Sequence, residues 1–341
     1  MTTGDYSIIE GDAAAILKDF PDECFHCCVT SPPYFGLRDY GNPGQIGMER
    51  TPDEYIAKLV RVFREVRRIL RGDGTLWLNI GDSYNTPNGR RSGAIRADTQ
   101  GTIQHTNSGS ITIGKSTTDL VDGIARKELI GIPWMLAFAL RSDGWYLRQD
   151  IIWHKPNPMP ESVRDRCTKA HEYLFLLSKN ERYYFDIQAM QEPCVKGYAR
   201  STFHNGKTAQ HQPGASTKPR RAGNKSHKYV NAYQSSDTEE HRTKAGLMDV
   251  ANKEWETRNR RSVWTIATQP FRGAHFATFP EKLVEPCVLA GSPATGLVLD
   301  PFCGSGTVGV VANRHGRYFV GIELTPEYVL MAEERISTSR G

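Results

Sequence analysis

The feature that most constrains this fold is a strand, a glycine-rich turn and a helix that follow one another near the C-terminal end of the chain. The apolar run 296–299 ends in Asp300, a turn rich in glycine follows, and residues 308–312 begin a helix. A further apolar run, 318–322, ends in Glu323. Glycines in such a turn let the backbone approach a ligand closely, and the first amides of the helix face that ligand. The pattern predicts a ligand-binding β-α-β unit.

The spacing of the glycines leaves two topologies open. Gly304, Gly306 and Gly309 match the dinucleotide fingerprint G-x-G-x-x-G, with Glu323 about 20 residues on, where a ribose partner is expected. A nicotinamide enzyme is therefore one interpretation. Such a fold begins at this motif and needs several more strands after it, whereas only 18 residues follow Glu323. The other interpretation is a circularly permuted sheet, in which this unit is the first half and the N-terminal strands are the second.

A second motif, Ser31-Pro32-Pro33-Tyr34, follows directly on the apolar run 25–30. Two prolines lack amide hydrogens and fix φ, so they end the strand and hold an extended backbone whose carbonyls can point at a ligand. The Ser31 hydroxyl adds an acceptor, and the Tyr34 ring offers a face for stacking on a planar base. Such acceptors suit the exocyclic amino group of a nucleobase. In the permuted sheet both motifs lie at the carboxyl edge, at the switch point.

These motifs resemble those of the amino-group DNA methyltransferases of bacteria and their phages, in the permuted order called the β group. Ser31–Tyr34 is similar to the catalytic motif of that family, Asp300–Thr307 to its S-adenosylmethionine loop, and Gly321–Leu324 to the strand that bears its ribose-binding acid. Gly11–Ala13 resembles the segment whose acid contacts the adenine of the cofactor. Residues 275–283 resemble the helix start that holds the methionine moiety.

The resemblance covers residues 5–85, 128–192 and 262–338. It implies an α/β fold with a doubly wound, mostly parallel sheet of the seven-stranded methyltransferase type, circularly permuted and carrying an inserted target-recognition region. The implied cofactor is S-adenosyl-L-methionine. The implied catalytic residues are Ser31, Pro32, Pro33 and Tyr34, and the implied cofactor-binding residues are Asp12, Phe276, Thr278, Phe279, Asp300, Phe302, Cys303, Gly304, Ser305, Gly306, Thr307 and Glu323.

By composition the chain divides into three parts. We expect residues 1–192 to form the catalytic half of the methyltransferase domain and residues 262–341 the cofactor-binding half. Within the first part, residues 85–122 are rich in Gly, Ser, Thr and Asn without apolar periodicity, which predicts a long mobile loop. Between the halves, 193–261 is predicted to be a basic target-recognition insertion, because the resemblance places target recognition in this interval and 196–230 contains eight Lys or Arg residues and no acidic one.

A solvated basic linker is the alternative interpretation of the insertion. DNA contacts are also expected from the proline-rich segment 153–160, where the family has a similar loop beside the target base. The predicted DNA-binding residues are Trp153, Lys155, Lys218, Arg220, Arg221 and Lys225.

Local patterns predict the other elements. Thr51–Glu54 is a capping box with proline at the first helical position, and apolar residues then recur on one face until Arg71-Gly72. Apolar runs predict a buried helix at 133–140 and strands at 7–9, 25–30, 75–80, 149–153 and 173–177.

Composition excludes several classes of protein. No stretch approaches the length of a membrane span and the first residues lack the order of a signal peptide, so we expect a cytoplasmic protein of a bacterial or phage-infected cell. The seven cysteines fit a reducing compartment, and the net charge of +5 is compatible with a polyanionic partner.

The cysteines themselves predict no catalytic or metal site. Cys24 and Cys27 have the spacing of a metal motif, but no second ligand pair follows, so no metal is predicted. The Pro-Cys pairs at Cys194 and Cys287 lack the rest of the pattern of cytosine-C5 methyltransferases. We interpret these two as buried or half-buried thiols.

The activity expected from the resemblance is methyl transfer to the exocyclic N4 amine of cytosine in double-stranded DNA. Serine at position 31 favours cytosine, because the adenine-N6 enzymes of that family usually place Asp or Asn there; adenine N6 stays open. Lower alternatives are methylation of RNA or of a small-molecule amine, and DNA binding without catalysis. A separate restriction endonuclease is a candidate partner, and both a monomer and a homodimer are open.

Overall fold

The computed structural model describes residues 5–36, 44–86, 120–121, 123–194, 256–269 and 279–339. Two compact units divide the chain: residues 1–190 with 261–341, and residues 191–260. The predicted insertion overlaps the second unit, whose described strands β6 (Gln191–Pro193) and β7 (Thr257–Asn259) pair antiparallel. Within the described ranges, no helix has both the length and the apolar character needed to cross a membrane.

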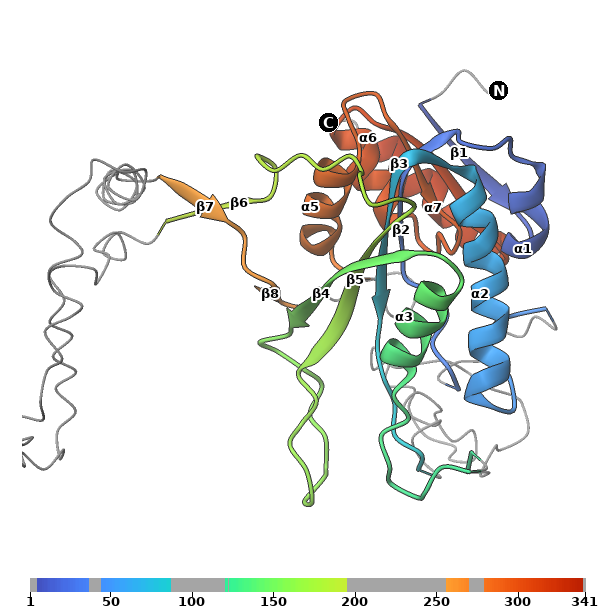
Figure 1. Ribbon diagram of the computed structural model, residues 1–341, viewed down its shortest axis with the longest axis vertical. Coiled ribbons are helices and arrows are strands. Elements are labelled where there is room, and N and C mark those ends of the chain that lie inside the picture. Colours follow the sequence, from blue (N-terminus) through green and yellow to red (C-terminus); the bar gives the residue numbers. More distant parts are fainter. Residues whose placement is uncertain are drawn as a thin grey trace, which may run out of the picture. The chain divides into compact units, whose positions relative to one another are not determined.

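The first unit is built on an eight-stranded sheet (Figure 1). The strand order is β1-β10-β9-β2-β3-β5-β4-β8, and all neighbours are parallel except that β5 runs antiparallel to β3 and to β4. A mostly parallel α/β sheet was predicted and is confirmed, with β8 as an additional edge strand. The strands are β1 (Tyr6–Glu10), β2 (Phe25–Thr30), β3 (Leu70–Ile80), β4 (Tyr146–His154), β5 (His171–Ser178), β8 (Val263–Thr265), β9 (Leu297–Asp300) and β10 (Tyr318–Glu323).

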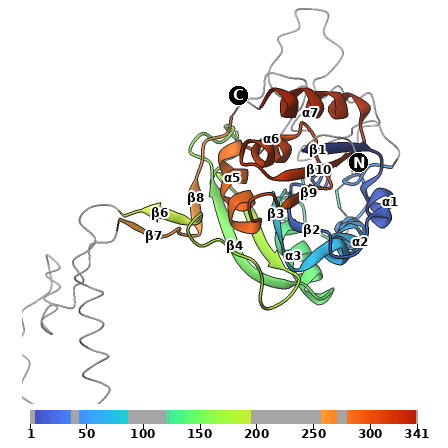
Figure 2. The same ribbon diagram turned by 90° about the horizontal axis from the view of Figure 1, so that it is seen from above.

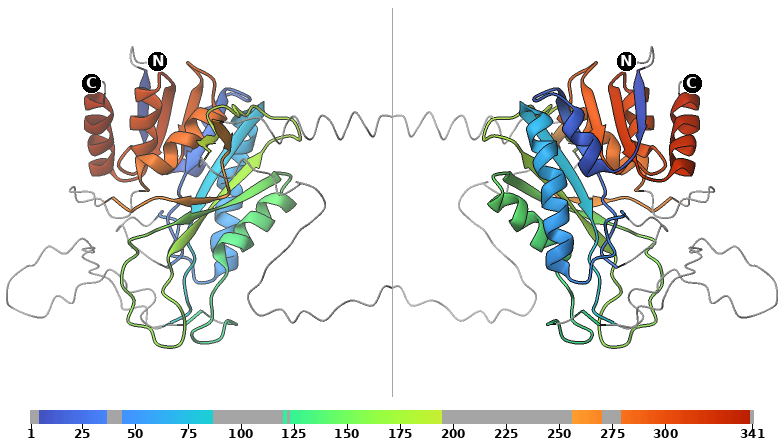
Figure 3. Two further views of the ribbon diagram at one scale, coloured as in Figure 1. Left: turned by 90° about the vertical axis from the view of Figure 1, so that its left-hand side faces the viewer. Right: turned by 90° about the vertical axis from the view of Figure 1, so that its right-hand side faces the viewer.

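Helices cover both faces of this sheet (Figures 2 and 3). Successive strand residues point to opposite faces, so Cys28 and Leu299 enter one apolar core while Cys27 and Val298 enter the other. The first core is covered by α1 (Ala13–Ile16), the 3-10 turn η1 (Leu17–Asp19), α2 (Pro52–Ile69) and α3 (Ile132–Ser142), and the second by α5 (Glu281–Gly291), α6 (Thr307–Arg314) and α7 (Pro326–Thr338).

The circular permutation is visible in the pairing of the first and last strands. β1 lies parallel to β10 with Ile8 opposite Gly321, and the Gly11 amide donates a 2.8 Å hydrogen bond to the Glu323 carbonyl. The helix α6 joins β9 to β10 over one face, whereas α2 joins β2 to β3 over the other, and β9 and β2 are neighbours. The switch point of the sheet therefore lies between β9 and β2, where a ligand crevice is expected.

Helix α2 begins as predicted and ends two residues early. The Thr51 hydroxyl accepts a 3.2 Å hydrogen bond from the Glu54 amide, and Pro52 occupies the first turn. At the other end, Leu70 leaves the helix with ψ of 141° and pairs with Phe25. Both side chains are fully buried, so burial in the sheet ends the helix at Ile69 rather than at Arg71-Gly72.

Most of the predicted loop 85–122 lies outside the described residues, but its two ends meet. The buried Asn85 side chain donates to the carbonyls of Val121 and Ile124 and accepts a 2.9 Å hydrogen bond from the Val121 amide. One asparagine thus closes this loop at its base.

The helix α6 depends on a glycine for its packing, and this gives a stability test. A Cβ at Gly309 would lie 2.3 Å from Cδ1 of Ile336 and 2.7 Å from Cδ1 of Phe319. We expect Gly309→Ala to lower the free energy of unfolding by about 1–3 kcal/mol through overpacking, although alanine is the better helix former. Urea unfolding followed by circular dichroism measures this. In the control Gly72→Ala the nearest atom is 3.6 Å away, so equal losses in both variants would contradict the packing argument.

Candidate active site

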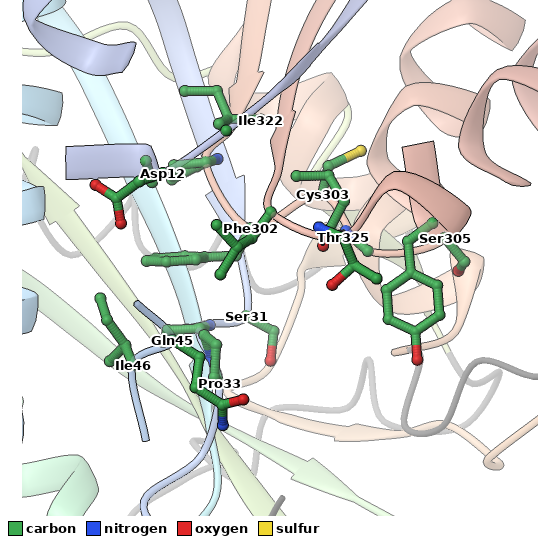
Figure 4. Close-up of a pocket in the computed structure, with 18 of the residues that line it drawn as sticks. Asp12, Ser31, Pro33, Gln45, Ile46, Phe302, Cys303, Ser305, Ile322 and Thr325 are labelled. Carbon is green, nitrogen blue, oxygen red and sulfur yellow. Dashed lines mark hydrogen bonds between the residues drawn. The ribbon is translucent and has the colours of Figure 1, made fainter. Parts of the chain in front are cut away.

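The neighbouring strands β2 and β9 end side by side, and the loops that follow them form two sides of one pocket. The Thr30 hydroxyl at the end of β2 donates a 2.6 Å hydrogen bond to Oδ1 of Asp300 at the end of β9. Each of these residues is only 1% exposed. The segment from Ser31 continues β2, the glycine loop continues β9, and both line the same pocket (Figure 4). The structure thus brings the two sequence motifs together.

The backbone of the Ser31–Tyr34 segment is held by two contacts, one with α2 and one with Gly47, which lies between this segment and α2 in the sequence. Tyr55, fully buried in α2, donates a 2.8 Å hydrogen bond to the Pro33 carbonyl. Gly47 has φ of +107°, and a Cβ there would lie 2.9 Å from the Tyr34 carbonyl oxygen. Only glycine allows this close approach, so the segment is fixed before any substrate binds.

Side chains of β3 and β5 hold the two functional side chains of that segment. The Ser31 hydroxyl lies 3.3 Å from Oδ1 of Asn79, and the Tyr34 hydroxyl donates a 2.7 Å hydrogen bond to Oε2 of Glu172. Burial, and then the Glu172 carboxylate, raise the pKa of Tyr34 well above its usual value. The phenol therefore stays protonated and keeps donating to Glu172.

The amides of the glycine loop are used within the protein. Three successive amides donate to protein oxygens: Phe302 to Oδ1 of Asp300 at 3.1 Å, Cys303 to the Ile322 carbonyl at 2.9 Å, and Gly304 to Oε2 of Glu323 at 2.8 Å. A pyrophosphate needs such amides as donors. These three amides are therefore not available to a pyrophosphate.

Glu323 is the acid that the loop surrounds. Its Oε1 accepts a 2.9 Å hydrogen bond from the Thr325 amide, while Oε2 accepts from Gly304. Burial raises the pKa of Glu323, and these amide donors oppose that shift. The side chain lines the pocket, so a carboxylate with fixed orientation faces any ligand there.

The rest of the lining combines apolar, neutral polar and acidic side chains. Figure 4 shows Phe302, Ile322 and Ile46 at the pocket together with Asp12, which also caps α1 by accepting from the Ala15 amide at 2.9 Å. Among the described lining residues there are two carboxylates and no Lys, Arg or His. Such a pocket favours a cationic ligand with a planar apolar part and disfavours an anionic one.

Several predicted cofactor residues line this pocket. Phe276 and Thr278 lie outside the described residues. Asp300 does not line it, because its carboxyl is buried behind the loop and bound to Thr30. The predicted residues that do line the pocket are Asp12, Phe279, Phe302, Cys303, Gly304, Ser305, Thr307 and Glu323, and with them Ser31, Pro32, Pro33 and Tyr34.

Two predicted DNA contacts have other roles here. Trp153 is 3% exposed and its indole Nε1 donates a 2.8 Å hydrogen bond to the Ile266 carbonyl, so the predicted contact of Trp153 with DNA is wrong. The Trp153 side chain packs in the second apolar core. Lys155 directly follows β4; its ammonium pairs with Glu172 and lies 4.3 Å from the Trp153 ring centroid. Lys218, Arg220, Arg221 and Lys225 lie outside the described residues.

Sequence reasoning missed Asn79 and Glu172, which hold the catalytic motif. Asn79 is 2% exposed and follows the apolar run 76–78, so a buried polar residue was the available signal for it. Glu172 lies in the half-buried start of β5, directly before the apolar run 173–177, and its sequence context gave no such signal. Their contact depends on the antiparallel pairing of β3 with β5, which places Asn79 opposite Leu174. The lining residues Gln45, Ile46, Pro301, Leu324, Thr325 and Tyr328 were also missed.

The seven cysteines are free thiols in the structure. Cys27 and Cys28 point to opposite faces of β2, and no group of three His, Cys, Asp or Glu residues could hold a metal within the described ranges. Cys287 is buried in α5 and Cys194 is half-buried, as was interpreted from their sequence contexts.

Comparison with known proteins assigns the family. The model of the N6/N4 DNA methylase family matches residues 25–334, and the chain belongs to this family. It is an S-adenosylmethionine-dependent DNA amino-methyltransferase, as the resemblance predicted. The family uses S-adenosylmethionine, which rules out the nicotinamide interpretation.

The similarity to named relatives extends over nearly the whole chain. It is 44% identical over 333 residues to Type II methyltransferase M.SmaI of Serratia marcescens, covering 98% of this chain and 91% of the relative. It is 41% identical over 340 residues to Type II methyltransferase M.Cfr9I of Citrobacter freundii, covering 97% and 87%.

Two solved structures share the fold. PvuII DNA methyltransferase (cytosine-N4-specific) matches with a TM-score of 0.59 at 19% identity, over 98% of this chain and 87% of that one. A DNA modification methylase of Thermus thermophilus, TTHA0409, complexed with S-adenosyl-L-methionine, matches with a TM-score of 0.53 at 22% identity, over 97% and 95%.

The pocket chemistry fits S-adenosylmethionine. That molecule is cationic at its sulfonium and carries an adenine ring and a ribose diol. The two carboxylates suit the positive charge and the hydroxyls, and the apolar side chains suit the ring. The residues present are therefore those such a cofactor needs.

The buried Asp300 gives a pH test of stability. Burial raises the pKa of Asp300 to about 7, and the Thr30 hydrogen bond opposes the shift. The folded protein therefore binds more protons than the unfolded chain between about pH 4 and pH 7, so this group makes stability fall as pH rises through that window. In Asp300→Asn this contribution disappears. We expect the free energy of unfolding of the variant, minus that of the wild type, to rise from pH 4 to pH 7 and then level off; a flat difference would show that Asp300 is ionised throughout.

Proposed function

We propose that this protein is a site-specific DNA methyltransferase that acts on the exocyclic N4 amine of cytosine. The observation that carries the proposal is the placement of the Ser31 hydroxyl. It lines the pocket and lies within hydrogen-bond distance of the Asn79 side-chain oxygen. Asn79 Oδ1 is an acceptor, so the Ser31 proton points toward it and the Ser31 lone pairs are left for the protons of an amine.

The chemistry of an aromatic amine explains why such acceptors are needed. The nitrogen lone pair is delocalised into the ring, so the amine is a weak nucleophile until acceptors hold its protons and favour a tetrahedral nitrogen. Ser31 Oγ and the Pro32 carbonyl supply these acceptors in our proposal. The half-buried Tyr34 ring stacks on the base once it has left the duplex. No covalent enzyme intermediate is required.

The cofactor side of the pocket is assigned in the same way. S-adenosylmethionine supplies the methyl group on an electrophilic sulfonium. Glu323 accepts hydrogen bonds from the ribose hydroxyls, Asp12 from the adenine amine, and Phe302 covers the adenine ring. Phe276, Thr278 and Phe279 are proposed to hold the methionine moiety. Asp300 is proposed to act on the cofactor indirectly, by fixing the loop through Thr30 and the Phe302 amide.

The choice of cytosine over adenine rests on Ser31. Adenine-N6 enzymes of this family usually have Asp or Asn at that position, and both amines need the same acceptors. The PvuII enzyme, named as cytosine-N4-specific, shares the fold. Adenine N6 is the second candidate for the target base.

The relatives point to the biological setting. M.SmaI and M.Cfr9I are named Type II methyltransferases, and each matches nearly the whole of this chain. We therefore propose that the protein protects a specific DNA site against a companion restriction endonuclease. Target recognition is assigned to the basic insertion 193–261, with Lys218, Arg220, Arg221 and Lys225 on phosphates.

The product identifies the target base. The protein is incubated with unmethylated double-stranded DNA and labelled S-adenosylmethionine, and the DNA is hydrolysed to nucleosides for mass spectrometry. We expect N4-methylcytosine, because Ser31 is the acceptor for the amine. Detection of N6-methyladenine alone would overturn the choice of base, and DNA that stays unlabelled would overturn DNA as the substrate.

Two substitutions separate the acceptor from the cofactor site. Ser31→Ala removes an acceptor for the amine, and we expect turnover to fall about 10²–10³-fold with cofactor affinity unchanged. Glu323→Ala removes the acceptor for the ribose, and we expect the dissociation constant for S-adenosylmethionine to rise about ten- to hundredfold. Calorimetry and single-turnover methylation measure the two effects. The reverse pattern in the two variants would exchange their assigned roles.

A further inference from the structure

We propose that Glu172, held by Lys155, is a positioning residue for methyl transfer. It orients the Ser31 acceptor through Asn79 and the Tyr34 ring through its phenol. This inference rests on the proposed function, in which Ser31 accepts a hydrogen bond from the target amine. Neither Glu172 nor Lys155 lines the pocket, so they act through the residues that do.

One oxygen of Glu172 is committed to a lysine. Lys155 directly follows β4, and its ammonium pairs with Oε1 of Glu172; the two side chains are 18% and 15% exposed. The ammonium also lies 4.3 Å from the ring centroid of Trp153, which is buried and fixed by its hydrogen bond to the Ile266 carbonyl. The cation is thus held from two sides, and it fixes the orientation of the carboxylate.

The other oxygen of Glu172 faces the catalytic motif. Oε2 accepts from the Tyr34 hydroxyl at 2.7 Å and from Nδ2 of Asn79 at 3.3 Å. The same Nδ2 donates to the Tyr173 carbonyl at 3.1 Å. With its nitrogen facing two acceptors on β5, the Asn79 amide must direct its oxygen toward Ser31. Together with the Tyr173 carbonyl, this carboxylate oxygen therefore sets both functional side chains of the Ser31–Tyr34 segment.

The polarity of this chain of hydrogen bonds determines what Ser31 can do. An amide does not take up a proton near neutral pH, so Asn79 is an acceptor for the Ser31 hydroxyl and not a base. Ser31 therefore stays a hydroxyl with free lone pairs, which is the acceptor that the aromatic amine needs. If the side-chain amide of Asn79 were flipped, its Nδ2 would donate a hydrogen bond to the Ser31 hydroxyl. A Ser31 lone pair would then be occupied by Asn79 and not by the target amine.

A purely structural ion pair would have a different signature. In a purely structural pair, removal of one partner leaves the other charge buried and unpaired, so the loss would appear in folding rather than in the chemical step. A positioning role predicts a lower rate of methyl transfer in a folded protein that binds its cofactor normally. The two cases are separable by comparing rate, cofactor affinity and thermal unfolding.

The test uses the full chain with Glu172→Gln, Lys155→Met and the double variant. In Glu172→Gln the new amide nitrogen faces either the Lys155 ammonium or Nδ2 of Asn79, and each of these groups is itself a donor. We expect the single-turnover rate at saturating DNA and cofactor to fall about tenfold or more, with the S-adenosylmethionine dissociation constant within about twofold. Adding Lys155→Met removes the opposing donor, so the rate of the double variant should exceed that of Glu172→Gln.

The matched control is Glu161→Gln, which neutralises the carboxylate of the 2.7 Å Glu161–Arg166 pair in the same β4–β5 connection. Its rate should equal that of the wild type. A Glu172→Gln rate equal to that of this control would overturn the proposal, as would a double variant whose losses simply multiply.

Two further variants complete the test. If Glu172→Gln is unfolded at the assay temperature, Tyr34→Phe tests the same connection, because it removes the hydroxyl and keeps the ring. A fall of about threefold or more with unchanged cofactor affinity supports the proposal, and an unchanged rate overturns it. Ser31→Ala is assayed in parallel: full activity in that variant defeats the proposed function itself, whereas loss there with none in Glu172→Gln defeats only the role of Glu172.

Discussion

The buried hydrogen bond between Thr30 and Asp300 is the contact on which the site depends. It joins the ends of β2 and β9 at 2.6 Å, away from water, where a polar pair is strong and an unpaired partner is costly. Each strand then turns into a loop that lines the pocket, so this one bond sets the distance between the acceptors for the base and the loop for the cofactor. Methyl transfer needs that distance to be fixed, because the reacting atoms must be held in line.

The two halves of the site are stiffened by different means. On the cofactor side, backbone amides of the glycine loop are satisfied by Asp300, Ile322 and Glu323, so the loop is rigid because its own polar groups are used. On the base side, two prolines limit the backbone, and side chains from other strands orient Ser31 and Tyr34. Both arrangements place acceptors in advance, so little reorganisation is needed when the amine arrives.

The sequence was sufficient for the parts of this protein that depend on local patterns. Apolar runs located the main strands, and the order of the two motifs along the chain predicted a permuted sheet, which the pairing of β1 with β10 confirms. The burial of individual side chains could not be predicted from these patterns. Trp153 was expected beside the target base but lies in the core, and Asp300 was expected on the cofactor but lies behind the loop. Asn79 and Glu172 were missed because their contact exists only through strand pairing, across 93 positions of sequence.

The permuted order also affects how the domain is made. During synthesis the first strands emerge early, yet the neighbours of β1 and of one edge of β2 are β10 and β9, which are made last. Until β9 and β10 are made, β1 and one edge of β2 have no strand to pair with. The apolar face of the sheet that α5, α6 and α7 cover in the folded protein is also uncovered at that stage. The Ser31 segment can be complete on the nascent chain, but the cofactor pocket cannot. The pocket can therefore form only after the β9–α6–β10 unit has been made and has covered those edges.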